Sequence, residues 1–297
     1  MSEGYDPEWL ELETTLGQRP LLIGDVDYMV KQYNALGAML GEQWGPPSDA
    51  VQARDEKIND HVTVRIYTPT PASQKKEQEP LPVGLYYHGG GYISGDLDFE
   101  DPICRIISEK TPCVLVSVDY RLAPKYKLPT GIDDGYDAFL WLGIQAHDNA
   151  SKLNGNPAAY FTIGGSAGGG IALAVTDKLI RNGKRHLVHG TVAMNPITTH
   201  MDNPPEKYKY IYTSYTEYAA NNAAVIDRHC MDVSFDILRD DGIVLERVLR
   251  DAGVKRVKRD HYVGFPHYFF VFPSVKTGRT FLLNVLRGVR SVLGLEE

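Results

Sequence analysis

The sequence contains few cysteines and no long apolar run, and each shortage excludes a class of protein. Its three cysteines form no C-x-x-C pair, so we predict neither a disulfide framework nor a zinc site. Buried, reduced thiols are expected at Cys104, Cys113 and Cys230. No stretch of about 18 apolar residues occurs, and the acidic N-terminus lacks the apolar core of a leader peptide. The sequence therefore predicts a cytoplasmic protein with no membrane span.

Positive charge is also scarce, because 31 lysines and arginines stand against 38 aspartates and glutamates, giving a net charge of -7. A phosphate backbone is bound by a basic face, so nucleic acid is excluded as the expected partner. One basic stretch, residues 254–260 (VKRVKRD), alternates in the manner of the solvated side of an edge strand. With 43% hydrophobic residues, the chain of 297 residues is typical of one large globular domain with a sizeable core.

Hydrophobic periodicity predicts helices first and then an alternation of strands and helices. Residues 7–16, with Asp6 as cap, and residues 25–44 have helical spacing, and two strands follow at 51–58 and 61–70. Beyond this point four strands, at 81–88, 112–120, 160–165 and 187–196, alternate with helices at 101–110, 130–146 and 167–182. The pattern predicts an α/β fold with a mostly parallel central sheet, helices on both faces, and function at the carboxyl ends of the strands.

The stretch YFTIGGSAGGG, residues 160–170, carries the sharpest chemical signal. A strand passes directly into a helix through a G-x-S-x-G turn, whose small neighbours allow its serine to sit in a tight, strained and exposed position. This pattern predicts Ser166 as a nucleophile. Phosphate-binding turns are the alternative, but Ser166 stands where a dinucleotide fingerprint needs glycine, and the Gly-Lys-Ser/Thr ending of a P-loop is absent.

The stretch LYYHGGGYISGD, residues 85–96, places three glycines at the end of another strand. A serine that attacks an acyl carbonyl creates an oxyanion, which preorganised N–H groups must stabilise. We predict that the backbone N–H groups of Gly90, Gly91 and Ala167 form this oxyanion hole, and that His88 braces the loop. A plain turn is the alternative for the glycines alone, and the downstream serine makes it less favoured.

A serine nucleophile needs a base and an acid that orients the base, in the chain order serine, acid, histidine. His267 follows a proline in VGFPHYFF, after the strand-like residues 254–264, and is the predicted base. Asp236, in SFDILRDDG before a helix at 242–253, is the predicted acid, with Asp240 as the alternative. Asp240 and the next aspartate could instead be simple caps of that helix.

Five motifs together resemble the hormone-sensitive-lipase-like esterases of the α/β-hydrolase fold, and most closely their fungal members. These are HGGG at 88–91, VDYRLAP at 118–124, GGSAGG at 164–169, DILRDDG at 236–242 and PH at 266–267. The resemblance covers most of the chain. It implies hydrolysis of small, moderately apolar carboxylic esters through an acyl-enzyme, such as deacylation of a secondary metabolite, with no metal or organic cofactor.

The resemblance also implies an organisation. Residues 1–46 are expected to form an N-terminal helical cap segment, and residues 47–297 the hydrolase core, with a second cap segment near 197–230, in a single domain. The tyrosine-rich residues 208–218 would lie in this cap, either as the wall of an acyl or aromatic pocket or as a half-exposed apolar surface. Asp119 and Arg121 are predicted to form a buried, paired structural corner outside the site.

Two departures from the family pattern keep other functions open. Gly165 replaces the aspartate that often precedes the nucleophile, a change that fungal relatives share. The interval from Pro196 to Asp236 is shorter than in relatives, so the strand expected to deliver the acid has no clear counterpart. A non-hydrolytic small-molecule-binding protein or an inactive variant is therefore the alternative function, although His267 favours an enzyme. Amide or lactone cleavage and acyl transfer share the acyl-enzyme step.

Overall fold

The computed structural model describes residues 4–70, 80–143, 153–200, 202–214, 225–226 and 238–295. Its contacts divide the chain into two compact units. One comprises Gly37–Met194 and Val285–Glu297 and contains Ser166, and we call it the serine unit. The other comprises Met1–Leu36 and Asn195–Asn284 and contains His267, and we call it the histidine unit.

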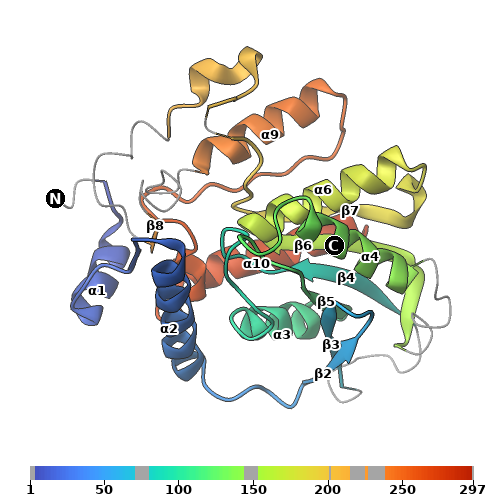
Figure 1. Ribbon diagram of the computed structural model, residues 1–297, viewed down its shortest axis with the longest axis horizontal. Coiled ribbons are helices and arrows are strands. Elements are labelled where there is room, and N and C mark those ends of the chain that lie inside the picture. Colours follow the sequence, from blue (N-terminus) through green and yellow to red (C-terminus); the bar gives the residue numbers. More distant parts are fainter. Residues whose placement is uncertain are drawn as a thin grey trace. The chain divides into compact units, whose positions relative to one another are not determined.

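A six-stranded sheet forms the centre of the serine unit (Figure 1). Strands β5, β4, β6 and β7 run parallel to one another in this spatial order, whereas β2 pairs antiparallel with β3, and β3 with β5. The prediction of a mostly parallel central sheet is therefore confirmed. The strands are β2 (Val51–Lys57), β3 (Thr63–Pro69), β4 (Leu81–Tyr87), β5 (Val114–Asp119), β6 (Gly155–Gly165) and β7 (Val188–Met194).

The predicted helices are confirmed, with ends that shift by a few residues at most in the described part of the chain. The helix α10 has no counterpart among the predicted elements. The helices are α1 (Pro7–Leu16), α2 (Val26–Trp44), α3 (Asp101–Lys110), α4 (Thr130–Gly143), α6 (Ala167–Arg181), α9 (Arg239–Asp251) and α10 (Lys276–Val292). Short elements are β1 (Leu21–Leu22), β8 (Val225–Ile226) and three 3-10 turns, η2 (Arg185–Leu187), η3 (Glu206–Ile211) and η4 (Phe269–Val271).

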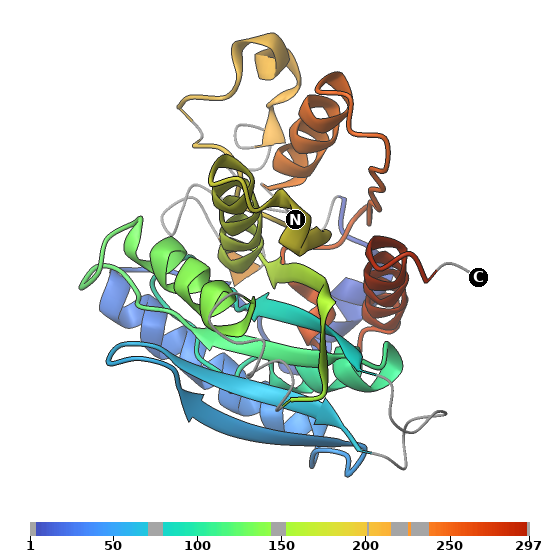
Figure 2. The ribbon, with the colours of Figure 1, turned by 90° about the vertical axis from the view of Figure 1, so that its right-hand side faces the viewer.

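Helices cover both faces of the sheet, because neighbouring side chains of a strand point in opposite directions. In β4, Tyr86 donates its hydroxyl hydrogen bond to Glu100, directly before α3. The next residue, Tyr87, donates to the carbonyl oxygen of Gly135 in α4, which packs against α6. Helix α3 therefore lies on one face and α4 and α6 on the other, as Figure 2 shows. The core between the sheet and helices α4 and α6 consists of aliphatic and aromatic side chains with almost no exposure. Among them are Val83, Leu85, Val116, Phe139, Ile171 and Val175.

In the histidine unit, two short strands join segments that are far apart in the sequence. Strand β1 pairs in parallel with β8, with Leu21 opposite Val225 and Leu22 opposite Ile226. Helix α1 begins at the predicted cap, since the Asp6 carboxylate accepts the backbone N–H of Glu8, two residues along, at 2.8 Å. The N-terminal residues of the unit thus pair with the segment that the sequence assigns to the second cap.

The predicted edge strand at residues 254–260 is wrong. These residues lie in an irregular segment after α9. An alternating pattern forms a strand when one of its faces is half-buried against other parts of the protein. Here Val254 is 43% exposed, and Val263, further along the same segment, is 76% exposed. Val257 is half-buried, but among the described residues no strand pairs with this segment, so it lacks the neighbour that a strand needs.

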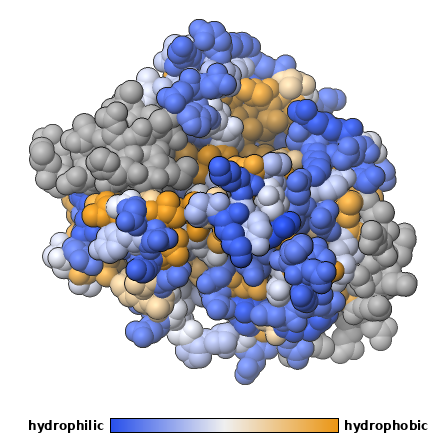
Figure 3. Space-filling model, viewed as in Figure 1, coloured by the Kyte–Doolittle hydropathy of each residue, from blue (hydrophilic) through white to orange (hydrophobic). Residues whose placement is uncertain are grey.

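The thiols and the surface are those of an ordinary globular protein. Cys104 and Cys113 are buried and free, which confirms the prediction for these two, whereas Cys230 lies outside the described residues. On the face shown in Figure 3, hydrophilic residues cover most of the described surface, with apolar residues in smaller patches between them. Among the described helices, none combines the length and the apolarity needed to cross a lipid bilayer.

Candidate active site

Ser166 stands at the junction of β6 and α6 in a strained conformation. Its backbone has φ 52° and ψ -118°, a region that non-glycine residues rarely adopt and that is found at functional sites. The side chain is largely buried, and the backbone N–H donates to the carbonyl oxygen of Met194, at the end of β7, at 2.8 Å. The turn thus has the strained backbone that the G-x-S-x-G pattern predicts, whereas the predicted exposure is wrong, because Ser166 is only 4% exposed.

The glycines on either side of this turn allow two backbones to touch. A Cβ atom on Gly168 would lie 1.9 Å from the carbonyl oxygen of Tyr87 and 2.4 Å from that of His88. A Cβ atom on Gly164 would lie 2.4 Å from the carbonyl oxygen of Gly168. Any side chain at these positions would push the first turn of α6 away from the end of β4. The close approach brings the serine turn and the glycine loop together within one unit.

The glycine loop after β4 turns sharply back on itself. Gly90 and Gly91 have φ values of 112° and 63°, and Tyr92 follows with φ 65°. The carbonyl oxygen of Gly90 accepts hydrogen bonds from the N–H and the hydroxyl of Ser94, at 2.9 and 3.0 Å. Within the described part of the chain, no acceptor takes the N–H groups of Gly90, Gly91 or Ala167. These three N–H groups are therefore available to an anionic oxygen.

His88 is buried against the base of this loop. Its Nδ1 atom lies 2.7 Å from the carbonyl oxygen of Gly89, and its ring stacks on Tyr120 with 4.2 Å between the ring centroids. The Tyr120 hydroxyl donates to the His88 carbonyl oxygen at 2.7 Å. Burial lowers the pKa of His88 to about 4, so the ring is neutral at neutral pH and Nδ1–H is the donor to Gly89. These contacts support a bracing role for His88.

His267 lies in a loop of the histidine unit whose shape is set by aromatic packing. The side chain is 2% exposed, and the following Tyr268 takes a left-handed conformation with φ 61°. Phe270 stacks on Phe281 of α10, with 4.1 Å between centroids and 3° between the ring planes. Further ring contacts at 4.7 to 5.6 Å join Phe265, Phe269, Tyr262 and Phe281. The histidine is thus presented by a loop with a rigid aromatic base.

The predicted acid, Asp236, lies outside the described residues. The alternative, Asp240, accepts hydrogen bonds from the backbone N–H groups of Thr213 and Ser214, both at 2.7 Å, and from Arg239 at 2.8 Å. Burial raises the pKa of Asp240, but the guanidinium and the two N–H groups outweigh it, and the pKa lies below its usual value.

The neighbouring Asp241 has a separate set of partners. One of its oxygens accepts from the hydroxyl and the N–H of Thr198 and from the N–H of Thr199, at 2.7 to 2.9 Å. The other accepts from the Tyr212 hydroxyl at 2.6 Å. Neither this carboxylate nor that of Asp240 bonds to a backbone N–H group of its own helix or to a histidine in the described residues. The interpretation as simple helix caps is therefore wrong, because both carboxylates hold the segment 198–214.

The structure also describes residues of two other motifs. In VDYRLAP, Arg121 forms a forked ion pair with Asp134 of α4, with Nη2 and Oδ1 2.7 Å apart, so its partner is not Asp119 as predicted. Burial raises the pKa of Asp119. In the tyrosine-rich segment, the Tyr212 ring is buried and Tyr210 is 71% exposed, while residues 215–218 lie outside the described part. Both interpretations of that segment stay predictions.

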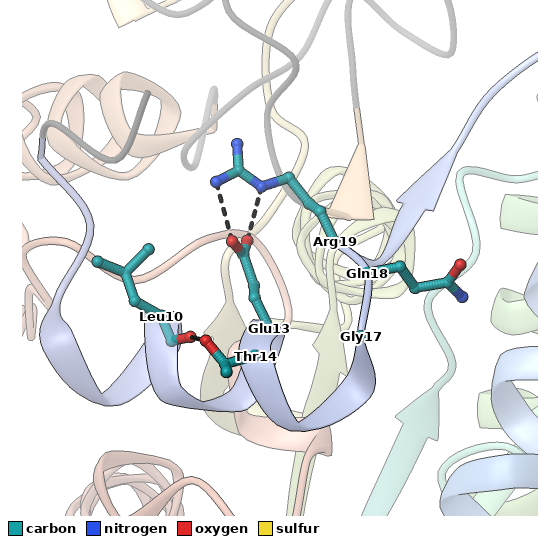
Figure 4. Close-up of a pocket in the computed structure, with 6 residues that line it drawn as sticks. All are labelled: Leu10, Glu13, Thr14, Gly17, Gln18 and Arg19. Atoms are coloured by element: carbon teal, nitrogen blue, oxygen red, sulfur yellow. Dashed lines mark hydrogen bonds and ion pairs between the residues drawn. The ribbon is translucent and has the colours of Figure 1, made fainter.

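A surface pocket of about 530 Å³ lies beside the end of α1 (Figure 4). Its charged groups satisfy each other, because the Glu13 carboxylate accepts two hydrogen bonds from the Arg19 guanidinium, at 2.7 and 2.9 Å. The pocket contains none of the predicted catalytic residues. Its lining consists of Leu10, Glu13, Thr14, Gly17, Gln18 and Arg19.

The chain is similar in sequence to a protein family and to individual proteins of fungi. Residues 84–233 match a family model described as the alpha/beta hydrolase fold. A versiconal hemiacetal acetate esterase from Dothistroma septosporum is 34% identical over 97% of this chain and 95% of the relative. A protein of the same name from Aspergillus parasiticus is also 34% identical, over 98% of this chain and 99% of the relative.

A solved structure has the same fold. The hyperthermophilic esterase from the archaeon Pyrobaculum calidifontis superposes with a TM-score of 0.80, over 97% of this chain and 98% of the other, at 24% sequence identity. The structural likeness shows the fold. The fungal relatives add a similarity in sequence that covers nearly the whole chain. The chain therefore belongs to the hormone-sensitive-lipase-like family of α/β-hydrolase carboxylesterases, as its motifs indicate.

Proposed function

We propose that the protein hydrolyses small, moderately apolar esters through an acyl-enzyme, with Ser166 as the nucleophile. The observation that carries the proposal is the combination of a strained serine turn with a glycine loop packed directly against it. Donors aimed at a developing oxyanion stabilise the transition state more than the substrate, which is what accelerates acyl transfer. The available N–H groups of Gly90, Gly91 and Ala167 would supply these donors.

In the proposed mechanism, the Ser166 hydroxyl attacks the ester carbonyl and its proton passes to His267. The resulting oxyanion is held by the N–H groups of the glycine loop and of Ala167. When the intermediate collapses, the alcohol leaves with the proton from the histidine, and water then repeats the sequence to release the acid. Asp236 would orient the histidine. His88 stays neutral and braces the loop.

The substrate class is proposed from the relatives. Both fungal relatives are named as esterases that act on a hemiacetal acetate. We therefore propose an acetylated secondary metabolite as the substrate of this chain. We also propose residues 1–46 and 197–230 as cap segments of a single-domain enzyme. The pairing of β1 with β8 supports this organisation, because it joins the two cap segments. The esterase relatives make a non-hydrolytic binding protein the less favoured alternative.

The direct test is hydrolysis of p-nitrophenyl acetate and butyrate by the purified protein and by Ser166→Ala. We expect turnover by the wild type and a loss of at least about 10³-fold in the variant. Labelling of the wild type, and not of the variant, by a fluorophosphonate would identify the nucleophile independently. Equal rates in both proteins, or no hydrolysis by a wild type that unfolds cooperatively, would refute the proposal.

A second comparison tests the acid. Asp236→Asn should lower kcat by about 10³- to 10⁴-fold without changing the unfolding temperature, because it removes the orientation of the histidine. Asp240→Asn should instead lower the unfolding temperature, because the buried Asp240 carboxylate accepts two backbone N–H groups and a guanidinium. The reverse result would assign the acid to Asp240.

A further inference from the structure

Glu100 is a buried carboxylate that the sequence motifs do not single out. Its side chain is 2% exposed, and it stands at the N-cap position of α3. The short polar side chains preferred in this position, such as that of aspartate, usually accept an N–H group of their own helix. Here the carboxylate forms no such bond, so the start of the helix does not explain why a charge is buried at this position.

The Glu100 carboxylate instead reaches the glycine loop. One oxygen accepts the backbone N–H of Gly89 at 3.0 Å, and the other accepts the hydroxyl of Tyr86. Both hydrogen bonds are buried. Each oxygen thus has a donor, as an ionised carboxylate requires. The side chain therefore ties the end of β4, the first glycine of the loop and the start of α3 to one point.

This contact fixes the first of three consecutive peptide units. In a planar trans peptide, the carbonyl oxygen and the N–H point in opposite directions. The unit between His88 and Gly89 is held at both ends, because its carbonyl oxygen accepts the Tyr120 hydroxyl and its N–H donates to Glu100. Without the carboxylate, this peptide would be held at one end, and glycine resists rotation less than other residues.

The two following units carry the N–H groups of the proposed oxyanion hole. The carbonyl oxygen of Gly89 lies 2.7 Å from Nδ1 of His88, which directs the N–H of Gly90 the opposite way. The carbonyl oxygen of Gly90 accepts from Ser94, which does the same for the N–H of Gly91. Any rotation of the first unit would pass to these two, and an oxyanion hole loses effect when its donors move by about half an ångström.

We infer that Glu100, together with Tyr86, is a positioning residue that holds the glycine loop in the orientation needed to stabilise the oxyanion. The inference rests on the proposed esterase function. Glu100 acts through Gly89 and does not touch the substrate. Its contribution is made in the transition state, so its removal should lower kcat and leave KM nearly unchanged.

The test measures kcat and KM for p-nitrophenyl butyrate in Glu100→Ala, Glu100→Gln and Tyr86→Phe, with the active enzyme counted by fluorophosphonate titration. We expect Glu100→Ala to lower kcat per titrated site by about 10- to 100-fold, with KM within about twofold of the wild type. Glu100→Gln keeps an acceptor for Gly89 and should stay within about threefold. Tyr86→Phe should lower kcat by about three- to tenfold.

The matched control is Glu109→Ala, since Glu109 lies on the same helix and pairs with Lys110 at the surface. It should leave kcat and KM unchanged. A trifluoromethyl ketone, which forms an oxyanion on the serine, should bind more weakly to Glu100→Ala by the same factor as the fall in kcat/KM. A loss confined to the number of titrated sites would show a merely structural role and overturn the inference.

The outcomes separate the inference from the proposed function. A wild type without esterase activity would overturn both. An active wild type, an inactive Ser166→Ala and an unchanged kcat in Glu100→Ala would overturn the positioning role alone. If Glu100→Ala does not fold, Tyr86→Phe decides, and a kcat per titrated site equal to the wild type would then refute the inference.

Discussion

The two regions that carry the proposed catalytic side chains are stabilised by different physical means. In the serine unit, the turn at Ser166 and the glycine loop are held by backbone groups in direct contact, with no room for a side chain at Gly168. In the histidine unit, His267 is presented by a loop that rests on stacked aromatic rings, and Asp241 binds a distant segment through its carboxylate. In the serine unit, an added side-chain atom at Gly168 would therefore disrupt the packing. In the histidine unit, the packing depends on individual side chains, each of which can be removed by substitution.

The sharpest test of this comparison is Gly168→Ala. Its Cβ atom would lie 1.9 Å from a backbone oxygen of β4, and backbone on both sides cannot yield, so we expect a loss of more than about 4 kcal/mol in the free energy of unfolding, or no folded protein. Soluble yield and thermal unfolding measure it. Gly242→Ala in α9, where nothing lies within 4 Å of the added atom, should be neutral or slightly stabilising. Equal behaviour of the two variants would break the comparison.

Phe281→Ala tests the aromatic base of the histidine loop. Phe281 is largely buried and contacts three other rings, so its truncation should cost about 3 to 4 kcal/mol in the free energy of unfolding. Leu283→Ala, two residues further along α10 and 54% exposed, is the matched control and should change it by less than about 0.5 kcal/mol. Urea titrations of both variants supply the values. Similar losses in the two would show that the rings do not anchor the loop.

The neutral state of His88 predicts a dependence of stability on pH. Its pKa is lowered from 6.5 to about 4 in the folded chain, so the unfolded chain binds the proton first as the pH falls. The contribution of neutral His88 to the free energy of unfolding is complete above pH 6.5 and is lost as the pH falls from 6.5 to 4. Since a pKa difference of one corresponds to about 1.4 kcal/mol, the loss reaches about 3 kcal/mol near pH 4.

Urea unfolding of the wild type and His88→Gln at pH 7.5 and 5 isolates this effect. The difference between the two pH values should be smaller in His88→Gln, whereas the exposed His61→Gln should keep the wild-type difference. An unchanged pH dependence in His88→Gln would contradict a neutral, buried ring.

Asp241→Asn tests the carboxylate that binds the segment 198–214. The amide cannot accept at both positions, so one of the three donor residues, Thr198, Thr199 or Tyr212, loses a partner that is itself fully buried. The expected cost is about 2 kcal/mol in the free energy of unfolding, measured by urea titration. Asp177→Asn, which removes a half-exposed carboxylate from an ion pair with Arg181 on the surface of α6, should leave the midpoint unchanged. An equal effect of the two substitutions would show that the Asp241 contacts do not hold the segment.

Much of the fold follows from local patterns in the sequence. The helices at 7–16 and 101–110 begin and end where the sequence predicts, the first also at its predicted cap, because these signals act over a few residues. The serine turn follows equally, since glycines next to Ser166 and the change from strand to helix periodicity are local. The stretch 254–260 shows the limit: its alternation is real, but a strand also needs a neighbour and a buried face.

The sequence by itself determined the α/β architecture, the strained serine turn and the glycine loop, because each depends on residue type and short-range spacing. Only the tertiary structure decided which carboxylate accepts hydrogen bonds from which donor. Arg121 pairs with Asp134 rather than Asp119, and Glu100 leaves its own helix to hold Gly89. Such partners come from segments that meet through folding, and one chain offers several carboxylates of equal chemistry. Distance in space, which spacing in the sequence does not specify, selects among them.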